Sequence, residues 1–404
     1  RNVLFGVFLN RGFESHPLCV EVDSLIYNKC MDQIECSQMV EQDDKGKERD
    51  LVAEDPEKVG LNFDHEYIID GRDLWPLEKH LKYIEERDGS ISDDINRFVE
   101  SGEAQKFIEE SRKRSESKKT LFTQYLLTFN GRIKHVRINP GGELSPLSPS
   151  QAIEYGDNDS FNVSIPQEFI NQIKELQKQV EDITLVLPFY DHRRGKEESS
   201  NVPKSPSQVE EYIAICKQVA NVFGNKIQLE IGNETNVSRT TGSMFSEKLQ
   251  HSTHVDTDEY GEFFFNVARA VKSEYPSLRM SMAGVACFDP TYIKEVVAKV
   301  TELQEKNGIN SHLIDTISFH PYRDNPSSGS VEVKNGSFVR SDLNYEQQME
   351  EMQKIASDIG AVLTVGEINF SSSDPLHFDK LKEAISVTKK KGIVSYIYPG
   401  IHVY

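Results

Sequence analysis

The chain has 404 residues, of which 37% are hydrophobic and 27% charged, and its formal net charge is −19 at pH 7. Such an acidic chain disfavours a nucleic-acid partner, because phosphate binding needs a basic face. No run of about 18 or more apolar residues is present, so the sequence predicts no membrane span. The length is compatible with two domains or with one large barrel that carries insertions.

The five cysteines contain no Cys-x-x-Cys pair, and their odd number and irregular spacing predict neither a disulfide framework nor a zinc site. A single bridge among Cys19, Cys30 and Cys36 stays open for a secreted protein. The sequence does not begin with Met, and the apolar residues 3–8 follow almost at once. The compartment therefore stays open between secretion, with the signal removed, and the cytoplasm.

The first strand is predicted at residues 3–8, where the sequence reads Val-Leu-Phe-Gly-Val-Phe. Residues 13–118 follow as a segment rich in charge and in helical spacing, and we interpret them as a mainly helical insertion. The remaining residues, 1–12 and 119–404, then form one barrel. The loop after a first barrel strand lies on the catalytic face. The insertion is therefore expected over that face, as a lid, a partner-binding module or an addition without a role.

From residue 121 onward, apolar strands alternate regularly with helices. The predicted strands span 133–138, 183–187, 227–231, 278–283, 314–319, 362–365 and 393–398, and the helices span 121–128, 166–180, 207–223, 259–274, 290–306, 345–359 and 375–391. With the first strand this makes eight strands, which predicts an α/β fold of the (β/α)₈ TIM-barrel type. A doubly wound open sheet is the alternative, although no GxGxxG turn follows the first strand.

Two of the predicted strands end in a glutamate. Glu234 follows Gly232-Asn233 at the end of the fourth strand, and Glu367 follows Gly366 at the end of the seventh. Paired carboxylates fit glycoside hydrolysis, in which one protonated acid serves the leaving oxygen and one carboxylate serves the anomeric carbon. We therefore interpret Glu234 and Glu367 as candidate catalytic residues.

Further candidates lie at the same ends of neighbouring strands. Arg137 is expected to keep Glu367 ionised, Tyr322 to align the same carboxylate, and Asn233 to hold a sugar 2-hydroxyl. The other candidates for substrate binding are His320, Tyr190, His192 and Tyr398.

Two basic features have two interpretations each. His192-Arg193-Arg194-Gly195-Lys196 is either a solvated loop or a grip on an acidic sugar, since arginine binds carboxylate or sulfate well. His251 and His254 are spaced for a metal, but the sequence offers no third ligand, so a plain loop is preferred. No metal and no organic cofactor is predicted.

These residues resemble clan A of the glycoside hydrolases, a group of retaining (β/α)₈ enzymes. The resemblance lies in Asn233-Glu234 at strand four, Glu367 at strand seven, Arg137 at strand two and His320-Pro321-Tyr322 at strand six. It implies that Glu234 is the general acid/base and Glu367 the nucleophile. The clan often places a Trp on strand eight, where this chain offers Tyr396 or Tyr398.

Within the clan, two stretches look most like the heparanase and β-glucuronidase family, namely residues 137–142 and 230–236, although that family usually has Pro where Thr235 stands. The function predicted is therefore retaining hydrolysis of a glycan that contains uronic acid or another β-linked sugar. The alternative is a catalytically inactive barrel that binds carbohydrate or protein. A carboxyl separation of about 5–5.5 Å favours the retaining enzyme.

Overall fold

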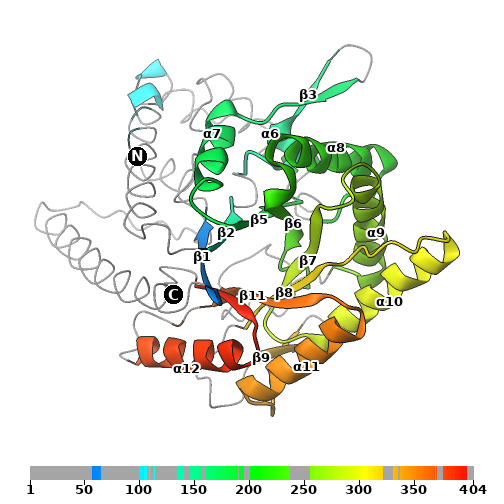
Figure 1. Cartoon of the computed structure of the whole chain (residues 1–404). Helices are drawn as coiled ribbons and strands as arrows, with labels where there is room; N and C mark the ends of the chain where they lie inside the picture. Colours follow the sequence, from blue (N-terminus) through cyan, green and yellow to red (C-terminus); the bar gives the residue numbers. More distant parts are fainter. Residues whose placement is uncertain are drawn as a thin grey trace, which may run out of the picture.

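The computed structural model describes residues 57–64, 100–102, 104–106, 109, 113, 134–140, 145–156, 160–189, 191–194, 201–236, 255–321, 331–334, 337–368, 370 and 376–397. Its centre is a closed barrel of eight parallel strands (Figure 1). The strands follow one another around the barrel in chain order: β1 (Val59–Asp64), β2 (His135–Asn139), β5 (Asp182–Leu187), β6 (Ile227–Asn233), β7 (Arg279–Ala286), β8 (Thr316–His320), β11 (Val362–Ile368) and β12 (Val394–Ile397). The predicted α/β fold with a parallel sheet is confirmed, and the barrel excludes the open doubly wound sheet.

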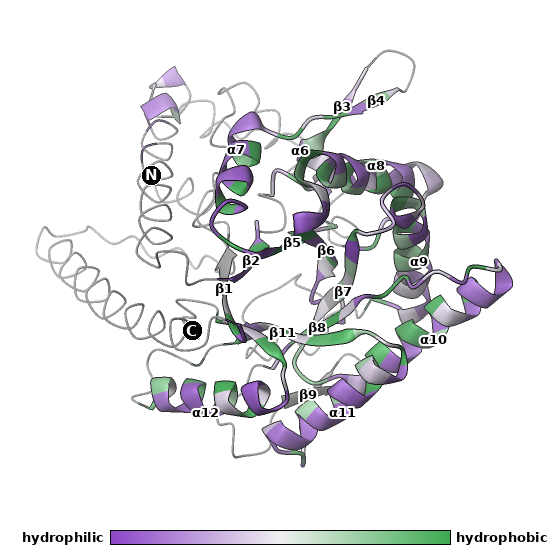
Figure 2. Cartoon of the chain, viewed as in Figure 1, coloured by the Kyte–Doolittle hydropathy of each residue, from purple (hydrophilic) through white to green (hydrophobic). Residues whose placement is uncertain are grey.

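In the part of the chain that the structure describes, six long helices surround the strands (Figure 1). They are α7 (Gln167–Leu176), α8 (Pro206–Phe223), α9 (Thr257–Glu274), α10 (Pro290–Lys306), α11 (Tyr345–Asp358) and α12 (His377–Lys390). Apolar and polar residues alternate along these helices (Figure 2), as expected of helices that bury one side against a sheet. Among the described residues, no helix is long and apolar enough to cross a membrane.

Local signals in the sequence explain where these helices begin. Ser205 precedes α8 and forms a capping box with Gln208, whose backbone N–H donates to the Ser205 hydroxyl at 3.3 Å. Asp289 precedes α10 and accepts the backbone N–H of Tyr292 at 3.0 Å. Pro at the first position of both helices adds a fixed φ that suits a helix start.

The strand that closes the barrel corrects one prediction. Val59–Asp64 pairs in parallel with β12, where Val59 faces Ser395, and with β2, where Leu61 faces Val136. This strand occupies the barrel position predicted for residues 3–8, which lie outside the described residues. A short apolar run is compatible with a barrel strand, but it does not specify the neighbours with which the strand will pair. Most of the predicted insertion 13–118 also lies outside the described residues, so its helical character and its place over the catalytic face stay predictions.

Two antiparallel hairpins were not predicted. β3 (Ile153–Tyr155) pairs with β4 (Phe161–Val163), and β9 (Val331–Lys334) pairs with β10 (Ser337–Arg340). The first hairpin follows the short helix α6 (Pro149–Ala152) and projects beside α8 (Figure 1). Both hairpins are inserted after a barrel strand, so they lie toward the end of the barrel where the strands finish.

The barrel interior contains a polar layer below the level of the predicted site. Thr316 donates a hydrogen bond from Oγ1 to Gln228 Oε1 at 2.9 Å, and the Thr184 hydroxyl lies 3.3 Å from the Tyr396 hydroxyl. Gln228 precedes Glu230 by two residues on β6, so this layer lies closer to the amino-terminal ends of the strands. It forms the floor beneath the charged residues described next.

Candidate active site

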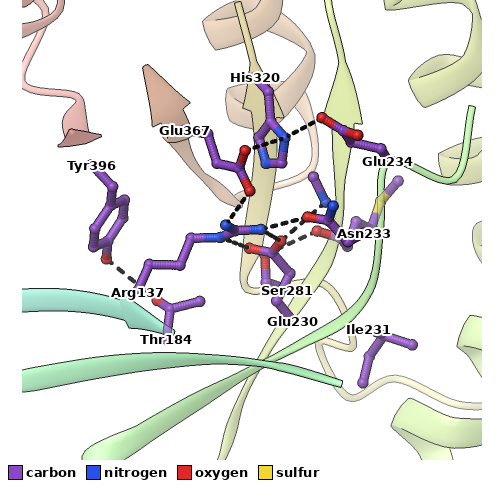
Figure 3. Close-up of polar contacts among 12 residues, drawn as sticks. Arg137, Thr184, Glu230, Ile231, Asn233, Glu234, Ser281, His320, Glu367 and Tyr396 are labelled. Carbon is purple, nitrogen blue, oxygen red and sulfur yellow. Dashed lines mark hydrogen bonds and ion pairs between the residues drawn. The ribbon is translucent and has the colours of Figure 1, made fainter. Parts of the chain in front are cut away.

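A fully buried arginine connects three strands at the carboxyl-terminal end of the barrel (Figure 3). Arg137 on β2 donates from Nη1 to Glu367 Oε1 on β11 at 2.7 Å. From Nη2 it donates to Glu230 Oε1 at 2.6 Å and to Asn233 Oδ1 at 2.8 Å, both on β6. Sequence analysis predicted Arg137, Asn233 and Glu367, and the structure brings them together.

The charge of Arg137 is compensated inside the protein. Burial opposes the charge, but the neighbouring carboxylates of Glu230 and Glu367 outweigh this effect and raise the pKa of Arg137 above its usual value. The guanidinium is therefore a permanent positive charge beside Glu367.

Glu230 is the member of the cluster that sequence analysis missed. It is only 1% exposed, and besides Nη2 it accepts Nε of Arg137 at 3.3 Å and the backbone N–H of Gly284 at 3.2 Å. A signal was present in the sequence, because Gln228 and Glu230 alternate with apolar residues along β6 and so share one face. A carboxylate on the inner face of a barrel strand needs a cationic partner, and Arg137 is the matching charge on another strand.

His320 lies between the two predicted catalytic glutamates (Figure 3). Its Nδ1 is 3.1 Å from Glu234 Oε1 and 3.7 Å from Glu367 Oε2, and its side chain is fully buried. Two glycines leave room for the ring: a Cβ on Gly284 would lie 2.1 Å from His320 Nε2, and one on Gly366 would lie 3.0 Å from it. The predicted site residue His320 therefore contacts Glu234 directly.

The turn that carries Glu234 has an uncommon backbone. Glu234 has φ +50° and Gly232 has φ +83°, and the left-handed region is rare for a residue with a side chain. A Cβ on Gly232 would overlap the Phe189 ring at 2.2 Å, so close packing as well as backbone shape favours glycine there. The Glu234 N–H donates to Gly284 O at 2.5 Å, which fixes the turn against β7.

Asn236 fixes the same turn from its other side. Its Nδ2 donates to Ala286 O at 3.0 Å and to Asp289 Oδ2 at 3.1 Å, while the Ala286 N–H donates to Asn236 Oδ1 at 2.8 Å. Residues held in sparsely populated backbone regions cost roughly 1–3 kcal/mol each and persist only where the surroundings determine them. The hydrogen bonds of Asn236 and of the Glu234 backbone hold the turn in this conformation.

The two candidate carboxylates lie close together. One carboxylate oxygen of Glu234, one ring nitrogen of His320 and one carboxylate oxygen of Glu367 lie within 4.8 Å of one another, and all three residues are buried. Such a set could also hold a metal ion. Arg137, however, already places a positive charge 2.7 Å from Glu367, and a second cation there would be repelled. The expectation of a site without a metal stays a prediction.

The basic cluster after β5 is engaged within the chain. Arg193 pairs with Asp191 at 2.6 Å and with Glu211 at 2.8 Å. Arg194 donates to the carbonyl oxygens of Asn201, at 2.7 Å, and of Phe189. For Arg193 and Arg194 these contacts within the chain favour neither a solvated loop nor a free grip on an acidic sugar, and Lys196 of the same cluster lies outside the described residues.

The remaining predicted residues divide into two groups. Tyr396 is only 3% exposed and belongs to the polar layer inside the barrel, so it is no sugar platform at the rim. The others lie outside the described residues, as does the side chain of His192: Tyr190, Tyr322, Tyr398, His251 and His254. Their predicted roles stay predictions.

No family model matches the chain, and no curated protein matches it significantly. Among solved structures, it is similar to a β-xylosidase from Caulobacter crescentus CB15 (17% identity, TM-score 0.39, 62% of this chain and 48% of that one). It is also similar to a family 39 glycoside hydrolase from Xanthomonas axonopodis pv. citri (13% identity, TM-score 0.44, 84% of this chain and 58% of that one). A third similar structure is a β-1,4-D-mannanase from Cryptopygus antarcticus (11% identity, TM-score 0.46, 70% of this chain and 78% of that one). The chain thus spans only 48% and 58% of the first two proteins. Likenesses this distant do not identify a function, which has to be argued from the site itself.

Proposed function

We propose that the protein is a retaining glycoside hydrolase that cleaves a β-linked glycan by double displacement. The observation that supports this most is the short separation of Glu234 and Glu367, since a carboxylate oxygen of one lies within 4.8 Å of a carboxylate oxygen of the other. Retaining enzymes keep their two carboxyl groups about 5–5.5 Å apart, whereas inverting enzymes leave about 6.5–9.5 Å for a water molecule. The resemblance to clan A agrees with this proposal.

The contacts of the two glutamates suit different roles. In the first step Glu367 attacks the anomeric carbon, and the bond to the leaving oxygen breaks while Glu234 gives that oxygen a proton. In the second step Glu234 takes a proton from water, the water oxygen attacks the same carbon, and the bonding electrons return to Glu367. Arg137 donates to Glu367 and places a positive charge beside the proposed nucleophile, whereas Glu234 lies next to His320.

Asn233 suits a contact to the sugar. Its Oδ1 accepts from Arg137, which leaves the amide nitrogen to donate, and Nδ2 has no partner among the described residues. We propose that this group donates to the sugar 2-hydroxyl, a contact that strengthens in the transition state.

The sugar itself is proposed to be neutral. An acidic sugar needs a cation that is available to bind it. Arg137, Arg193 and Arg194 are all engaged by groups of the chain itself. A neutral β-linked sugar therefore fits the described part of the site better than a uronic acid, and the link to the heparanase family stays an expectation.

The decisive experiment compares the wild type with Glu367→Ala and Glu234→Ala on 2,4-dinitrophenyl and on phenyl β-glycosides of several sugars, which carry a good and a poor leaving group respectively. We expect the Glu367 variant to lose hydrolysis to background, and the Glu234 variant to lose roughly 10²–10⁴-fold on substrates with poor leaving groups, because it lacks the general acid. Azide should rescue the Glu367 variant with inverted product and the Glu234 variant with retained product.

Glu211→Gln is the matched control, since Glu211 is also a buried carboxylate paired with an arginine but lies outside the predicted catalytic pair. Equal rates for the wild type and the Glu367 variant would overturn the proposal. The alternative of an inactive, carbohydrate-binding barrel would then be favoured if the wild type bound these sugars without cleaving them.

A further inference from the structure

We propose that Glu230 is a positioning residue that acts through Arg137 and keeps that buried cation paired while Glu367 carries the sugar. The inference rests on the proposed function. It assigns a task to a carboxylate that neither attacks the sugar nor transfers a proton.

Glu230 holds Arg137 through two of its guanidinium nitrogens. Two guanidinium nitrogens contact Glu230, Nη2 at 2.6 Å and Nε at 3.3 Å, and Nη1 donates to Glu367 at 2.7 Å. The backbone N–H of Gly284 holds Glu230 from the β7 side at 3.2 Å. Glu230 therefore fixes the place of the guanidinium, and Glu367 contacts its remaining edge.

The charge of Glu367 changes during double displacement, but that of Arg137 does not. When a carboxylate oxygen of Glu367 bonds to the anomeric carbon, the product is an ester without net charge. Arg137 is fully buried, and a buried cation without a counter-charge is strongly destabilising. Glu230 is the anion that stays beside Arg137 in this covalent intermediate, so its negative charge stabilises the intermediate relative to the free enzyme.

Removing that charge should act in opposite directions on the two steps. In the Glu230→Gln variant, Arg137 would keep the negative charge of Glu367 in the free enzyme, but neither Glu230 nor Glu367 would supply a negative charge beside it in the intermediate. Formation of the intermediate should slow, because it consumes the charge of Glu367. Breakdown should speed up, because it restores that charge. A general loosening of the site would instead slow both steps.

The experiment uses 2,4-dinitrophenyl 2-deoxy-2-fluoro-β-glycosides of glucose, xylose and galactose, which form slowly hydrolysed intermediates. Intact mass measures the rate of labelling, peptide mapping identifies the labelled residue, and recovery of activity after removal of the reagent measures breakdown. For Glu230→Gln we expect labelling about tenfold slower, the effect of losing one charged hydrogen bond, and breakdown several-fold faster than in the wild type.

Two further variants make the outcome decisive. Glu230→Asp keeps the charge, so its ratio of the two rates should stay closer to the wild type, whereas Glu211→Gln should alter neither rate. Circular dichroism and thermal unfolding check that each variant is folded. If both rates of the Glu230→Gln variant fall by the same factor, or neither changes, the inference is overturned while the proposed function stands. A wild type that is never labelled at Glu367 would overturn the proposed function, and the inference with it.

Discussion

At the scale of single residues, the position of His320 depends on two neighbouring glycines, which have no side chain to occupy the space of its ring. The ring occupies the space beside Gly284 on β7 and Gly366 on β11, and a Cβ on either glycine would come within 3.0 Å of Nε2. Neither glycine has a positive φ, so the backbone conformation does not require glycine at these positions. The His320 ring does, because it occupies the space that a Cβ would need. Packing against these two strands directs Nδ1 toward Glu234.

Replacing Gly284 by alanine should therefore disturb the site. The new methyl group would lie 2.1 Å from His320 Nε2, so the ring has to move and its contact with Glu234 should be lost. Overpacking of this kind costs roughly 1–3 kcal/mol of unfolding free energy. We expect hydrolysis of aryl glycosides to fall by about two orders of magnitude, as for a displaced catalytic group.

Gly308→Ala is the control for this variant. Gly308 has no atom within 4 Å of its added Cβ, but its φ of +64° makes alanine unfavourable by about 1 kcal/mol. It should lower the unfolding free energy, measured in urea, without changing activity. If the two variants lose stability and activity in the same proportion, the Gly284 effect is only one of stability.

The site was predictable in part from residue types at strand ends. Glu234 and Glu367 follow apolar runs, and Arg137 lies within one, so their convergence followed from the barrel prediction. Glu230 was missed because the strand was interpreted as an apolar run, although its polar residues alternate. The ring of His320 could be placed only with a structure, because two glycines on other strands define its space.

At the scale of elements, tyrosines on the helices hold the ends of the strands that carry the site. Tyr212 on α8 donates to Leu187 O at 2.5 Å, and Tyr260 on α9 donates to Ile231 O at 2.9 Å. Both hydroxyls reach the carboxyl-terminal ends of β5 and β6, just before Phe189 and Gly232. These contacts connect the outer helices to the turn of Glu234.

The opposite end of β5 is held by an ion pair, which yields a pH-dependent prediction. Burial of Asp182 opposes its ionisation, but His135, which lies 3.8 Å away, and Arg279, which donates to Asp182 at 3.1 Å, outweigh it and hold the pKa of Asp182 below its usual value. Because the pKa is lower in the folded state, the ion pair stabilises the fold fully when the pH is above the pKa of Asp182 in the unfolded chain, about 3.9. This stabilisation is lost as the pH falls through the pKa of Asp182 in the folded protein. Asp182→Asn should therefore lower the unfolding free energy at pH 7 by about 1 kcal/mol, given the partly exposed pair.

Urea unfolding at pH 7 and near pH 2 tests this. The difference between wild type and Asp182→Asn should shrink at the acid end, because protonation of Asp182 progressively removes its charge. Glu175→Gln, which removes an exposed pair with Lys178, should have little effect at either pH. A difference for Asp182→Asn that is the same at both pH values would contradict the assigned charge effect.

Elements were predictable where periodicity and caps agree. The predicted helix 290–306 matches α10, whose start is marked by Asp289 and Pro290. The hairpins β3–β4 and β9–β10 were missed because their strands have only three or four residues, too few to show a period. Local sequence thus specified the long elements but not the short ones.

At the scale of the whole molecule, closure of the barrel is the property that sequence could not determine. Seven of the eight strands were found from alternation with helices, but the eighth depends on which segment pairs with both β12 and β2. Residues 3–8 and Val59–Asp64 are both compatible with a strand, and only the pairing distinguishes them. An unclosed barrel leaves unpaired N–H and C=O groups on two strand edges, which favours aggregation.

Two deletions distinguish these alternatives. Removing residues 13–118 takes away Val59–Asp64, so β2 and β12 lose their common neighbour and the chain should show no cooperative thermal unfolding. Removing residues 1–12 instead takes away the strand expected from sequence but leaves the described barrel closed, so cooperative unfolding should persist. Differential scanning calorimetry measures both. If the chain without residues 13–118 unfolds cooperatively, and the one without residues 1–12 does not, then residues 3–8 supply the closing strand and the pairing of Val59–Asp64 is wrong.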